Sequence, residues 1–271
     1  MQAALNHAHV RIVQSRQNAR VKELRAALRK GEKTASGLVA LEGLHLVEEA
    51  LRSGLRILTV FVRSGNLALL NQLRIGLETE ILELSPDVFS SAVTTESPQP
   101  IAALVEAPAF SPDAIFSAPN PLLLVSAGLQ DPGNLGTIIR SAEAFGAAGI
   151  TTLPGTVSAW NPKALRASAG SAFRLPVVPL DAKTLFSSLR VHGIRAVATT
   201  VEGGTPAQKL DLSQPVALFI GNEGSGLPEE IVGQCDERIT ISCPGPVESL
   251  NAAIAASILL YEASRQRGRK S

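Results

Sequence analysis

The sequence is poor in several features that define whole classes of protein. Its 271 residues include two cysteines, Cys235 and Cys243, which do not suit a disulfide scaffold or a four-cysteine zinc site. There is no run of 18 or more apolar residues and no charged–apolar–cleavage pattern at the start, so neither a membrane span nor a signal peptide is predicted. Lys and Arg total 25 against 24 Asp and Glu, which excludes a uniformly polybasic nucleic-acid binder but not a local basic patch. These absences predict a soluble, cytoplasmic protein.

Several signatures of catalysis and metal binding are also missing. No metal site is predicted, because the histidines lie without carboxylates or cysteines at ligand spacing; they are His7, His9, His45 and His192. The chain has no G-x-S-x-G, H-E-x-x-H or Cys–His arrangement, which argues against a hydrolase. The single Trp160 and the single Tyr261 are interpreted as packing residues. Apolar residues make up 45% of the chain, enough to bury a core and to exclude overall disorder.

The N-terminal part contains a strong concentration of positive charge. Residues 10–33 hold two acidic residues and eight basic ones, a local balance of +6: Arg11, Arg16, Arg20, Lys22, Arg25, Arg29, Lys30 and Lys33. Val21, Leu24 and Leu28 recur at helical spacing, which predicts an amphipathic helix with a basic solvent face. That face is either an ordinary solvated surface or a surface that contacts phosphates, and the segment alone leaves both interpretations open.

The pattern of apolar residues divides the chain into two α/β parts. A helical pattern over 43–53 and a strand over 57–62 are followed by a second helix–strand pair over 66–84, which predicts a small domain with a partly parallel sheet. Prolines concentrate between 106 and 121, and we place the domain boundary there. Beyond it come apolar strands typical of a parallel sheet covered on both faces; they span 122–126, 150–153, 195–199 and 216–220.

Three loop-to-helix segments, each after a strand of the second part, carry its polar residues. In the first, residues 129–146, Asn134 is expected to cap a helix that runs from about Gly136 to Ala147. Arg140 lies one turn inside this otherwise small and apolar helix start, so we expect it to face a cleft or a partner anion. The alternative interpretation is a structural ion pair between Arg140 and Glu143.

The second segment, residues 219–230, places three glycines after a buried strand. Gly221, Gly224 and Gly226 permit positive φ angles and a close approach of the backbone to a ligand. Their spacing is neither the dinucleotide fingerprint nor a P-loop, which argues against a nicotinamide-dependent oxidoreductase and a nucleotide hydrolase. The alternative is a tight strand-to-helix turn with the helix beginning at Pro228.

The third segment, residues 241–261, leads into a long helix of small residues. Ser249 and Asn251 add two polar groups at the start of that helix, and the alanines along one face permit very close packing. A well-capped core helix would explain the alanines. It would not explain the polar sequence from Glu248 to Asn251.

Together, these segments resemble the three motifs of the SpoU/TrmH family of RNA ribose 2′-O-methyltransferases, within the SPOUT class. The motifs match as Asn134-x-Gly136-x-x-x-Arg140-x-Ala142, Gly221-Asn-Glu223-Gly224-x-Gly226-Leu227 and Ser249-Leu250-Asn251. The resemblance covers about residues 120–267. The N-terminal part more loosely resembles the family's L30e-like substrate-binding domain, through Ser15-x-x-Asn18-x-x-Val21-Lys22 and Leu41-Glu42-Gly43.

The resemblance implies an α/β fold with an L30e-like domain over 1–107, a linker over 108–120 and a SPOUT methyltransferase domain over 121–271. That domain would have a parallel sheet with helices on both faces and a deep trefoil knot, in an obligate homodimer. S-adenosylmethionine would lie against Thr199, Gly221, Cys243 and Leu250. The catalytic group would comprise Asn134, Arg140, Glu223, Ser249 and Asn251. Structured RNA would be contacted by Arg16, Arg20, Lys22 and Arg25.

The implied chemistry requires the ribose 2′-hydroxyl to lose its proton as the sulfonium methyl transfers in line. Family proposals make Arg140 the base, although a guanidinium group in water stays protonated far above neutral pH. An equally good account is that Arg140 binds the adjacent phosphate and stabilises the developing oxyanion. The resemblance also allows Arg140 to act across the dimer interface. Both roles stay open. Asn134 and Asn251 would orient Arg140 or the ribose. Glu223 would hold the loop or Arg140, and Ser249 would supply a hydrogen bond near the reacting oxygen.

The third motif departs from the family pattern in one respect. The family has Ile-Pro-Met and a longer glycine-containing loop, whereas this chain has Cys243-Pro244, a shorter loop and no methionine. The loop around the methionine tail of the cofactor is therefore expected to sit differently. Every catalytic position holds the expected residue type, which favours an active enzyme. The separate N-terminal domain favours ribosomal RNA, 23S-like, by analogy alone; a tRNA 2′-O-methyltransferase and a non-catalytic RNA-binding protein are the alternatives.

Overall fold

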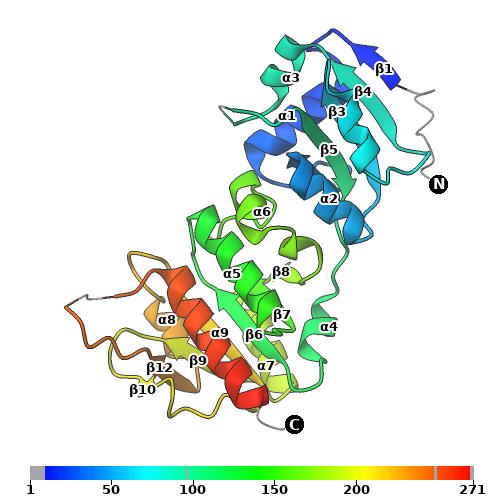
Figure 1. The fold of residues 1–271 in the computed structure, drawn as a ribbon. Helices are drawn as coiled ribbons and strands as arrows, with labels where there is room; N and C mark the ends of the chain where they lie inside the picture. The colour runs from blue at the N-terminus through cyan, green and yellow to red at the C-terminus, as the bar shows by residue number, and fades with distance from the viewer. Residues whose placement is uncertain (1–9, 96, 247–248, 269–271) are drawn as a thin grey trace. The chain divides into compact units, whose positions relative to one another are not determined.

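The computed structural model describes residues 10–95, 97–246 and 249–268, and the chain forms two compact α/β units (Figure 1). The first unit comprises the chain up to Pro108 together with Ser158–Phe173. The second comprises Ala109–Val157 and the chain from Arg174 onward. Ser158–Phe173 thus groups with the N-terminal unit, although it lies between strands of the second unit and no local pattern indicates this.

The first unit is built on a five-stranded mixed sheet in the order β1-β4-β3-β5-β2. Its strands are β1 (Val10–Val13), β2 (Leu38–Glu42), β3 (Ile57–Arg63), β4 (Glu80–Leu84) and β5 (Ile101–Glu106). β1, β4 and β3 run parallel, whereas β5 is antiparallel to both β3 and β2. The prediction of a partly parallel sheet is confirmed.

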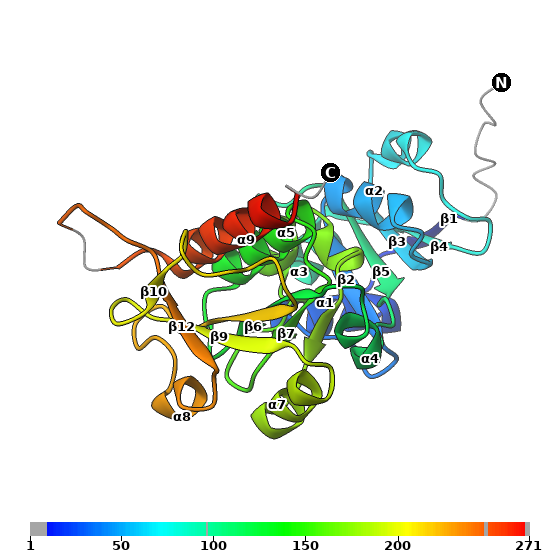
Figure 2. The ribbon, with the colours of Figure 1, turned by 90° about the horizontal axis from the view of Figure 1, so that it is seen from below.

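Helices cover both faces of this sheet (Figure 2). They are α1 (Ala19–Lys30), α2 (Leu44–Arg52), the 3-10 helix η1 (Leu67–Gln72) and α3 (Pro86–Ala92). The side chain of Asn18 caps α1 by accepting from the N–H groups of Arg20 and Val21, and the helix ends at Gly31, whose φ of 66° suits glycine. α1 packs with α3 over one core cluster, while α2 packs on β2 and β5.

The segment Ser158–Phe173 covers the β2 edge of the first unit's sheet. It contains α6 (Pro162–Ser168), which packs on β2, and the 3-10 helix η2 (Ser171–Phe173). Asn161 caps α6 by accepting from the N–H of Lys163 at 2.9 Å. At Gly31 the two segments lie so close that a Cβ there would stand 3.0 Å from Asn161 Nδ2. This packing protects an edge strand that would otherwise be open to pairing.

The second unit contains a seven-stranded sheet in which every neighbouring pair is parallel, in the order β10-β12-β9-β11-β6-β7-β8. The strands are β6 (Leu122–Ser126), β7 (Gly149–Thr152), β8 (Val177–Pro179), β9 (Arg195–Thr199), β10 (Thr205–Pro206), β11 (Val216–Ile220) and β12 (Glu237–Thr240). The strands predicted over 122–126, 195–199 and 216–220 have the predicted bounds. β8, β10 and β12 escaped prediction because they are short and lack a continuous apolar run.

Helices lie on both faces of the parallel sheet, as predicted (Figure 2). α5 (Pro132–Ala144) and α9 (Ala252–Gly268) pack against each other on one face, where Ser141 Oγ and Ser257 Oγ are 2.7 Å apart. The other face carries α4 (Pro112–Phe116), α7 (Ala182–Val191) and α8 (Glu229–Val232), whose buried residues share one core cluster with the strands. The expected α/β class, with a parallel sheet that has helices on both faces, is therefore confirmed.

α5 begins earlier than the sequence predicts. Its cap is Asp131, whose Oδ1 accepts from the N–H of Gly133 at 2.6 Å, and Pro132 fills the first helical position. A carboxylate cap followed by proline is a favourable helix start that the prediction overlooked. Asn134 therefore lies inside the first turn, where its side chain is not needed as a cap.

Arg267 anchors the C-terminal end of α9 to the start of two strands. Its guanidinium donates to the carbonyl oxygens of Asn120 at 2.6 Å, Leu212 at 2.9 Å and Gln214 at 2.6 Å. Burial lowers the pKa of Arg267, against an opposing effect of Asp211. This anchor holds the helix whose opposite end carries Asn251.

Candidate active site

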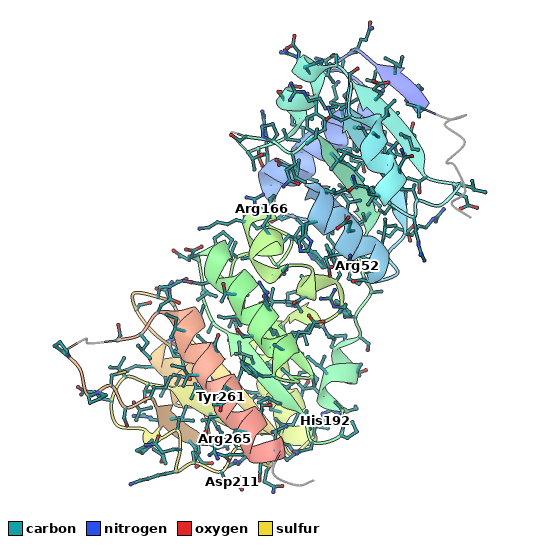
Figure 3. All side chains as sticks on the ribbon, viewed as in Figure 1. Arg52, Arg166, His192, Asp211, Tyr261 and Arg265 are labelled. Atoms are coloured by element: carbon teal, nitrogen blue, oxygen red, sulfur yellow. The ribbon has the colours of Figure 1, made fainter. Side chains whose placement is uncertain are left out.

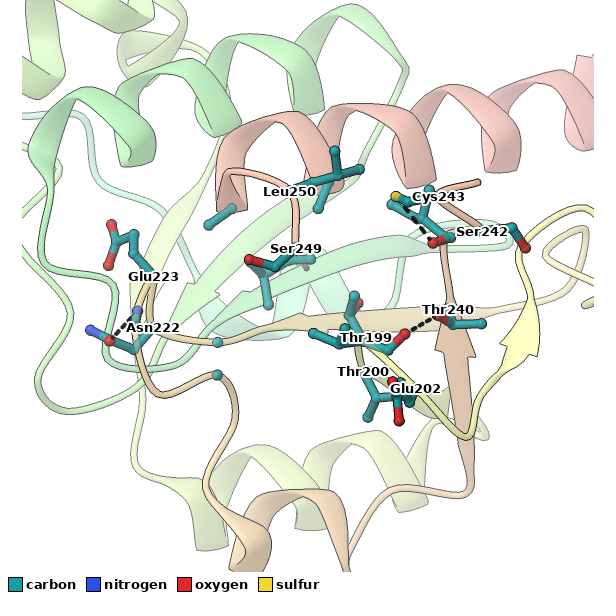
Figure 4. Close-up of a pocket in the computed structure, with 18 residues that line it drawn as sticks. Thr199, Thr200, Glu202, Asn222, Glu223, Thr240, Ser242, Cys243, Ser249 and Leu250 are labelled. Carbon is teal, nitrogen blue, oxygen red and sulfur yellow. Dashed lines mark hydrogen bonds between the residues drawn. The ribbon is translucent and has the colours of Figure 1, made fainter. Parts of the chain in front are cut away.

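A pocket of about 520 Å³ lies at the carboxyl ends of β9, β11 and β12, which are neighbours in the sheet (Figure 4). Its walls are the segments that follow these strands together with the start of α9. Figure 4 shows Asn222 and Glu223 at one end of the pocket, and Thr240 and Cys243 toward the other. Open parallel sheets bind their ligands at this edge, because the loops after the strands converge there.

The structure brings most of the predicted site residues to this pocket. All four residues expected to contact a cofactor line it: Thr199, Gly221, Cys243 and Leu250. Glu223 and Ser249 of the expected catalytic group also line it. Glu248, directly before the third motif, lies outside the described residues, as does Val247.

Other lining residues were given no role from the sequence. They include Thr200, Glu202, Asn222, Thr240 and Ser242. Thr200 directly follows a predicted strand, and Asn222 stands between two motif residues, so their positions could have indicated them. Ser242 directly precedes Cys243, so its position could also have indicated it. Thr240 could not be found in this way, because its strand, β12, was not predicted.

Two buried hydroxyl groups in the pocket lack a protein partner. Thr199 Oγ1 and Thr200 Oγ1 are inaccessible to solvent and have no hydrogen-bond partner among the described residues. The neighbouring Thr240 differs, because its hydroxyl donates to the carbonyl oxygen of Val201 at 2.7 Å. An unpaired buried hydroxyl costs roughly 1–3 kcal/mol, and a polar ligand that reached either threonine would offset that cost.

Gly221 lies where the chain folds back on itself after β11. The N–H groups of Asn222 and Gly226 each donate to the other residue's carbonyl oxygen at 3.0 Å, which closes a tight loop. A Cβ at Gly221 would overlap the backbone of Gly226 and Leu227. Gly226 itself has a φ of 69°, which favours glycine. The first and last glycines of the motif are therefore needed for the shape of the pocket wall.

Asn222 ties this loop to the loop after β6. Its Nδ2 donates to the carbonyl oxygen of Gly128 at 2.8 Å. Its Oδ1 accepts from the N–H groups of Gly224 at 2.9 Å and Ser225 at 3.2 Å. The carboxamide of Asn222 thus uses both its donor and its acceptor group to hold the loop after β11 against the loop after β6.

Three motif residues form a directed chain of hydrogen bonds. Asn251 Oδ1 caps α9 by accepting from the N–H of Ala253 at 2.9 Å, which leaves its Nδ2 to donate to Asn134 Oδ1 at 3.1 Å. Asn134 Nδ2 in turn donates to Glu223 Oε1 at 3.0 Å. A carboxylate only accepts, so it fixes the orientation of Asn134, which fixes that of Asn251. The helix start, the first motif and the second motif are thereby locked together.

The carboxylate of Glu223 is held by several donors besides Asn134. Its oxygens accept from the backbone N–H of Asp131 at 3.2 Å and of Gln130 at 3.4 Å. Partial burial acts to raise the pKa of Glu223, but the hydrogen bonds from Asn134 and from backbone N–H groups outweigh it, and the net pKa is lowered. Glu223 is therefore a charged acceptor that holds the site together.

Glu223→Gln is expected to lower stability at neutral pH and to weaken its acid dependence. A lowered folded-state pKa means that the charged carboxylate stabilises the fold above its ordinary pKa of about 4.3, and that this is lost as the pH falls through the folded value. The melting temperatures of the two proteins should therefore differ most at pH 7 and converge toward pH 3. Glu230→Gln, in exposed α8, is the matched control. A difference that stays constant from pH 7 to pH 3 would contradict this role.

Arg140 is exposed on α5 and does not line the pocket of its own chain. Its side chain makes no hydrogen bond or ion pair with the described residues. The alternative interpretation, a pair with Glu143, is wrong, because Glu143 is bound by Arg174, with Nε–Oε1 at 2.6 Å and Nη2–Oε2 at 3.0 Å. The guanidinium of Arg140 is thus available to a group outside this chain.

The expected RNA-binding residues of the first unit fall into two groups. Arg16 and Lys22 are exposed. Arg20 forms ion pairs with glutamates of α1 and β4, and Arg25 donates to Ser91 O at 2.8 Å and Ser91 Oγ at 2.9 Å. Arg20 and Arg25 are therefore engaged in holding α1 to the rest of the unit.

Within residues 10–95, 97–246 and 249–268, no set of three or more His, Cys, Asp or Glu side chains is grouped so that it could hold a metal ion. Within the same residues, no helix has the length and apolar character needed to cross a membrane.

The parallel sheet, the glycine- and threonine-lined pocket at its carboxyl edge and the linked Asn–Asn–Glu group are parts of a fold that superposes on SpoU methyltransferase structures. Residues 121–261 match the model of the SpoU rRNA Methylase family, and residues 18–103 match that of the MRM3-like substrate binding domain. The chain belongs to the SpoU rRNA Methylase family.

Two relatives match along nearly the whole chain. It is 35% identical over 249 residues to the Bacillus subtilis 23S rRNA (guanosine(2553)-2'-O)-methyltransferase RlmP, covering 92% of this chain and 97% of that protein. It is 33% identical over 261 residues to the Streptomyces viridochromogenes 23S rRNA (uridine(2479)-2'-O)-methyltransferase, covering 92% and 91%. The crystal structure of the SpoU methyltransferase AviRb from Streptomyces viridochromogenes in complex with AdoMet superposes with a TM-score of 0.80 at 31% identity, covering 93% and 100%.

Proposed function

We propose that this protein transfers a methyl group from S-adenosylmethionine to the ribose 2′-hydroxyl of a nucleotide in ribosomal RNA, with 23S rRNA as the favoured substrate. The observation that carries the proposal is the meeting of the second and third motifs in one pocket, linked to the first through Asn134. The names of the relatives in Bacillus and Streptomyces support ribose methylation of 23S rRNA, and the AdoMet complex supports the cofactor.

The pocket residues fit the proposed cofactor. When bound, S-adenosylmethionine supplies the methyl group on a sulfonium sulfur. The unpaired hydroxyls of Thr199 and Thr200 would hydrogen-bond to its polar groups. Gly221 keeps the wall free of a side chain, and Leu250 adds an apolar surface. Cys243, at the motif position that departs from the family pattern, lies exposed at the rim.

Within the proposed reaction, the polar residues divide into positioning groups and groups that touch the substrate. Asn251, Asn134 and Glu223 hold the loops around the pocket, since their hydrogen-bonding groups are largely used among themselves and on the backbone. Ser249 would hydrogen-bond near the reacting 2′-oxygen as that oxygen loses its proton. Arg140 would bind the neighbouring phosphate and stabilise the negative charge that develops on the 2′-oxygen.

Homodimerisation belongs to the same proposal. Ile254, Ile258 and Tyr261 recur at helical spacing on α9 and remain 53%, 38% and 55% exposed. Figure 3 shows Tyr261 on this helix. Large apolar side chains clustered on one helix face mark an interaction surface. Arg140, on the packed neighbour α5, reaches no acceptor among the described residues of its own chain, so a second copy would complete the site.

A charge on this face should separate the dimer. Ile258→Glu is expected to give a monomer, because a carboxylate cannot be buried there without a partner. Val191→Glu on α7, at an exposed apolar position on the opposite face of the sheet, should leave the dimer intact. Light scattering coupled to size-exclusion chromatography measures both masses. A wild-type mass of one chain would overturn the dimer, as would an unchanged mass for Ile258→Glu.

We further propose the domain division 1–107, 108–120 and 121–271, a trefoil knot in the last part, and action in the cytoplasm. Membership of the SpoU rRNA Methylase family supports the knotted topology. The matched ranges 18–103 and 121–261 support the domain limits. A ribosomal substrate would place the enzyme where ribosomes are assembled.

The decisive experiment is transfer of tritiated methyl groups from S-adenosylmethionine to unmodified transcripts of 23S rRNA, 16S rRNA and tRNA. We expect incorporation into 23S rRNA at one nucleotide, which alkali-resistant cleavage then maps. Incorporation into tRNA alone would replace the substrate by its alternative. No incorporation into transcripts or assembled subunits, with no cofactor binding by calorimetry, would overturn the enzyme and leave the non-catalytic RNA-binding protein.

A further inference from the structure

One face of the first unit carries exposed cations that the fold itself does not use. α1 buries its apolar side and presents to solvent a row that continues just past its C-terminal cap: Lys22, Arg29, Lys30 and Lys33. None of these side chains has a hydrogen bond or ion pair with a described residue. Of the two acidic residues in the same segment, Glu23 is occupied by Arg20 and Ser36. The other, Glu32, is exposed beside Lys33 and offsets one charge, so the row keeps an excess of positive charge.

The cations of α1 that do have partners point to a different role. Arg25 donates to Ser91 and to the carbonyl oxygen of Arg16, and Arg20 pairs with Glu23 at 2.9 Å and Glu80 at 3.5 Å. These contacts fasten α1 to α3 and β4. An arginine committed in this way would have to break its bonds to reach a ligand, whereas the exposed row would not.

α6 extends the exposed row. Gly31, which ends α1, is packed directly against Asn161, and Lys33 Nζ lies 5.2 Å from the ring centroid of Trp160. Arg166 is exposed one turn further along α6, and its side chain has no partner among the described residues (Figure 3). Cations separated by more than 130 positions in the sequence thus share one side of the first unit.

We infer that the exposed side of α1 and α6 forms a single RNA-contact surface; its cations are Lys22, Arg29, Lys30, Lys33 and Arg166. The inference rests on the proposed function and names the surface that holds the substrate RNA. Its ligand is the phosphate backbone, because unpaired lysines and arginines along a helix bind phosphates at low desolvation cost and read no sequence. The stretch Ser158–Phe173, which lies within the methyltransferase part of the sequence, supplies part of the substrate-binding surface.

The test removes one charge from each helix. Lys30→Gln/Arg166→Gln is compared with Arg11→Gln/Arg74→Gln, which removes two exposed charges from the same unit, one at the opposite β1 edge of the sheet and one in the loop before β4. Binding to an unmodified 23S rRNA transcript is measured from 50 to 400 mM KCl. Two lost phosphate contacts should weaken binding about tenfold at low salt and reduce the slope of log K against log salt by about 1.5. The control pair should leave the slope unchanged.

Trp160 provides a second readout, because it is the one tryptophan of the chain and lies under Lys33. Its fluorescence should change saturably on titration with the same transcript, at the dissociation constant found by direct binding. Melting temperature and cofactor affinity of both variants should match the wild type. Two results would overturn the inferred RNA-contact surface without affecting the proposed enzyme activity. One is an unchanged salt slope for RNA binding by Lys30→Gln/Arg166→Gln, and the other is an equal loss of RNA affinity in both pairs of variants. A wild type that neither binds nor methylates the RNA would overturn both.

Discussion

Arg140→Ala is expected to lower the rate constant for methyl transfer by about 100- to 1000-fold, the usual effect of removing a group that stabilises charge in a transition state. The affinity for S-adenosylmethionine should not change, because Arg140 does not line the pocket. Stability should not change either, since the side chain is exposed and has no partner among the described residues. Single-turnover methylation and calorimetry separate the two effects.

The control for this variant is Arg190→Ala, which removes an exposed arginine from α7 on the other face of the sheet. It should retain full activity. The mass of Arg140→Ala in solution is measured in parallel, so that a lost dimer is not mistaken for a lost catalytic group. A rate within a few-fold of wild type, with the dimer intact, would show that Arg140 does not act on the reacting atoms.

Arg140→Lys distinguishes the two roles left open for the arginine. If the guanidinium stabilises charge and binds phosphate, lysine keeps the charge but cannot make the bidentate hydrogen bonds. The rate should then fall by the same factor at every pH. If the residue removes the proton, the lysine ammonium group loses its own proton at lower pH than a guanidinium group does, so the neutral, proton-accepting form increases with pH and the rate should rise steeply. We expect a loss that does not depend on pH.

Gly221→Ala is expected to weaken binding of S-adenosylmethionine by roughly 100-fold and to lower activity at least as much. The added Cβ would overlap backbone atoms of Gly226 and Leu227, which cannot rotate away as a side chain can. Overpacking strain of about 1–3 kcal/mol is released only by opening the loop, and this removes one wall of the pocket.

Gly224→Ala in the same loop is the matched control. Its Cβ would lie 3.6 Å from Asn222 Oδ1, an ordinary contact, and its φ is not positive. Because Gly224 also lines the pocket, we expect a modest loss of binding, clearly smaller than that of Gly221→Ala. Calorimetry on both variants, with melting temperatures to confirm folding, gives the comparison. If Gly221→Ala binds the cofactor as Gly224→Ala does, the close approach of the two loop strands is not what shapes the pocket.

The motifs and the parallel sheet could be predicted because both depend on short-range patterns. Continuous apolar runs such as Leu122–Ser126 and Val216–Ile220 identify buried parallel strands with their true bounds. The glycines of the second motif and the polar start of α9 indicated the pocket wall in the same way. Where a local signal was misread, the error was small: α5 begins at Pro132 because Asp131 caps it.

The partners of individual side chains could not be predicted in this way. The basic segment indicated a charged helix, but nothing local distinguishes Arg25, which is bound to Ser91, from Lys30, which is exposed. Likewise, the spacing of Arg140 and Glu143 permits an ion pair that the structure replaces by the pair of Glu143 with Arg174. Such choices depend on which residues the packed chain brings alongside.

By itself, therefore, the sequence determined the family, the α/β class and the identity of the motif residues, because these are written in local composition and spacing. Only the tertiary structure decided that Asn251 and Asn134, 117 positions apart, and Asn134 and Glu223, 89 apart, form one chain of hydrogen bonds. It also decided that Ser158–Phe173 packs with the N-terminal unit. Contacts over such separations arise from the packing of whole elements, and no periodicity along the chain encodes them.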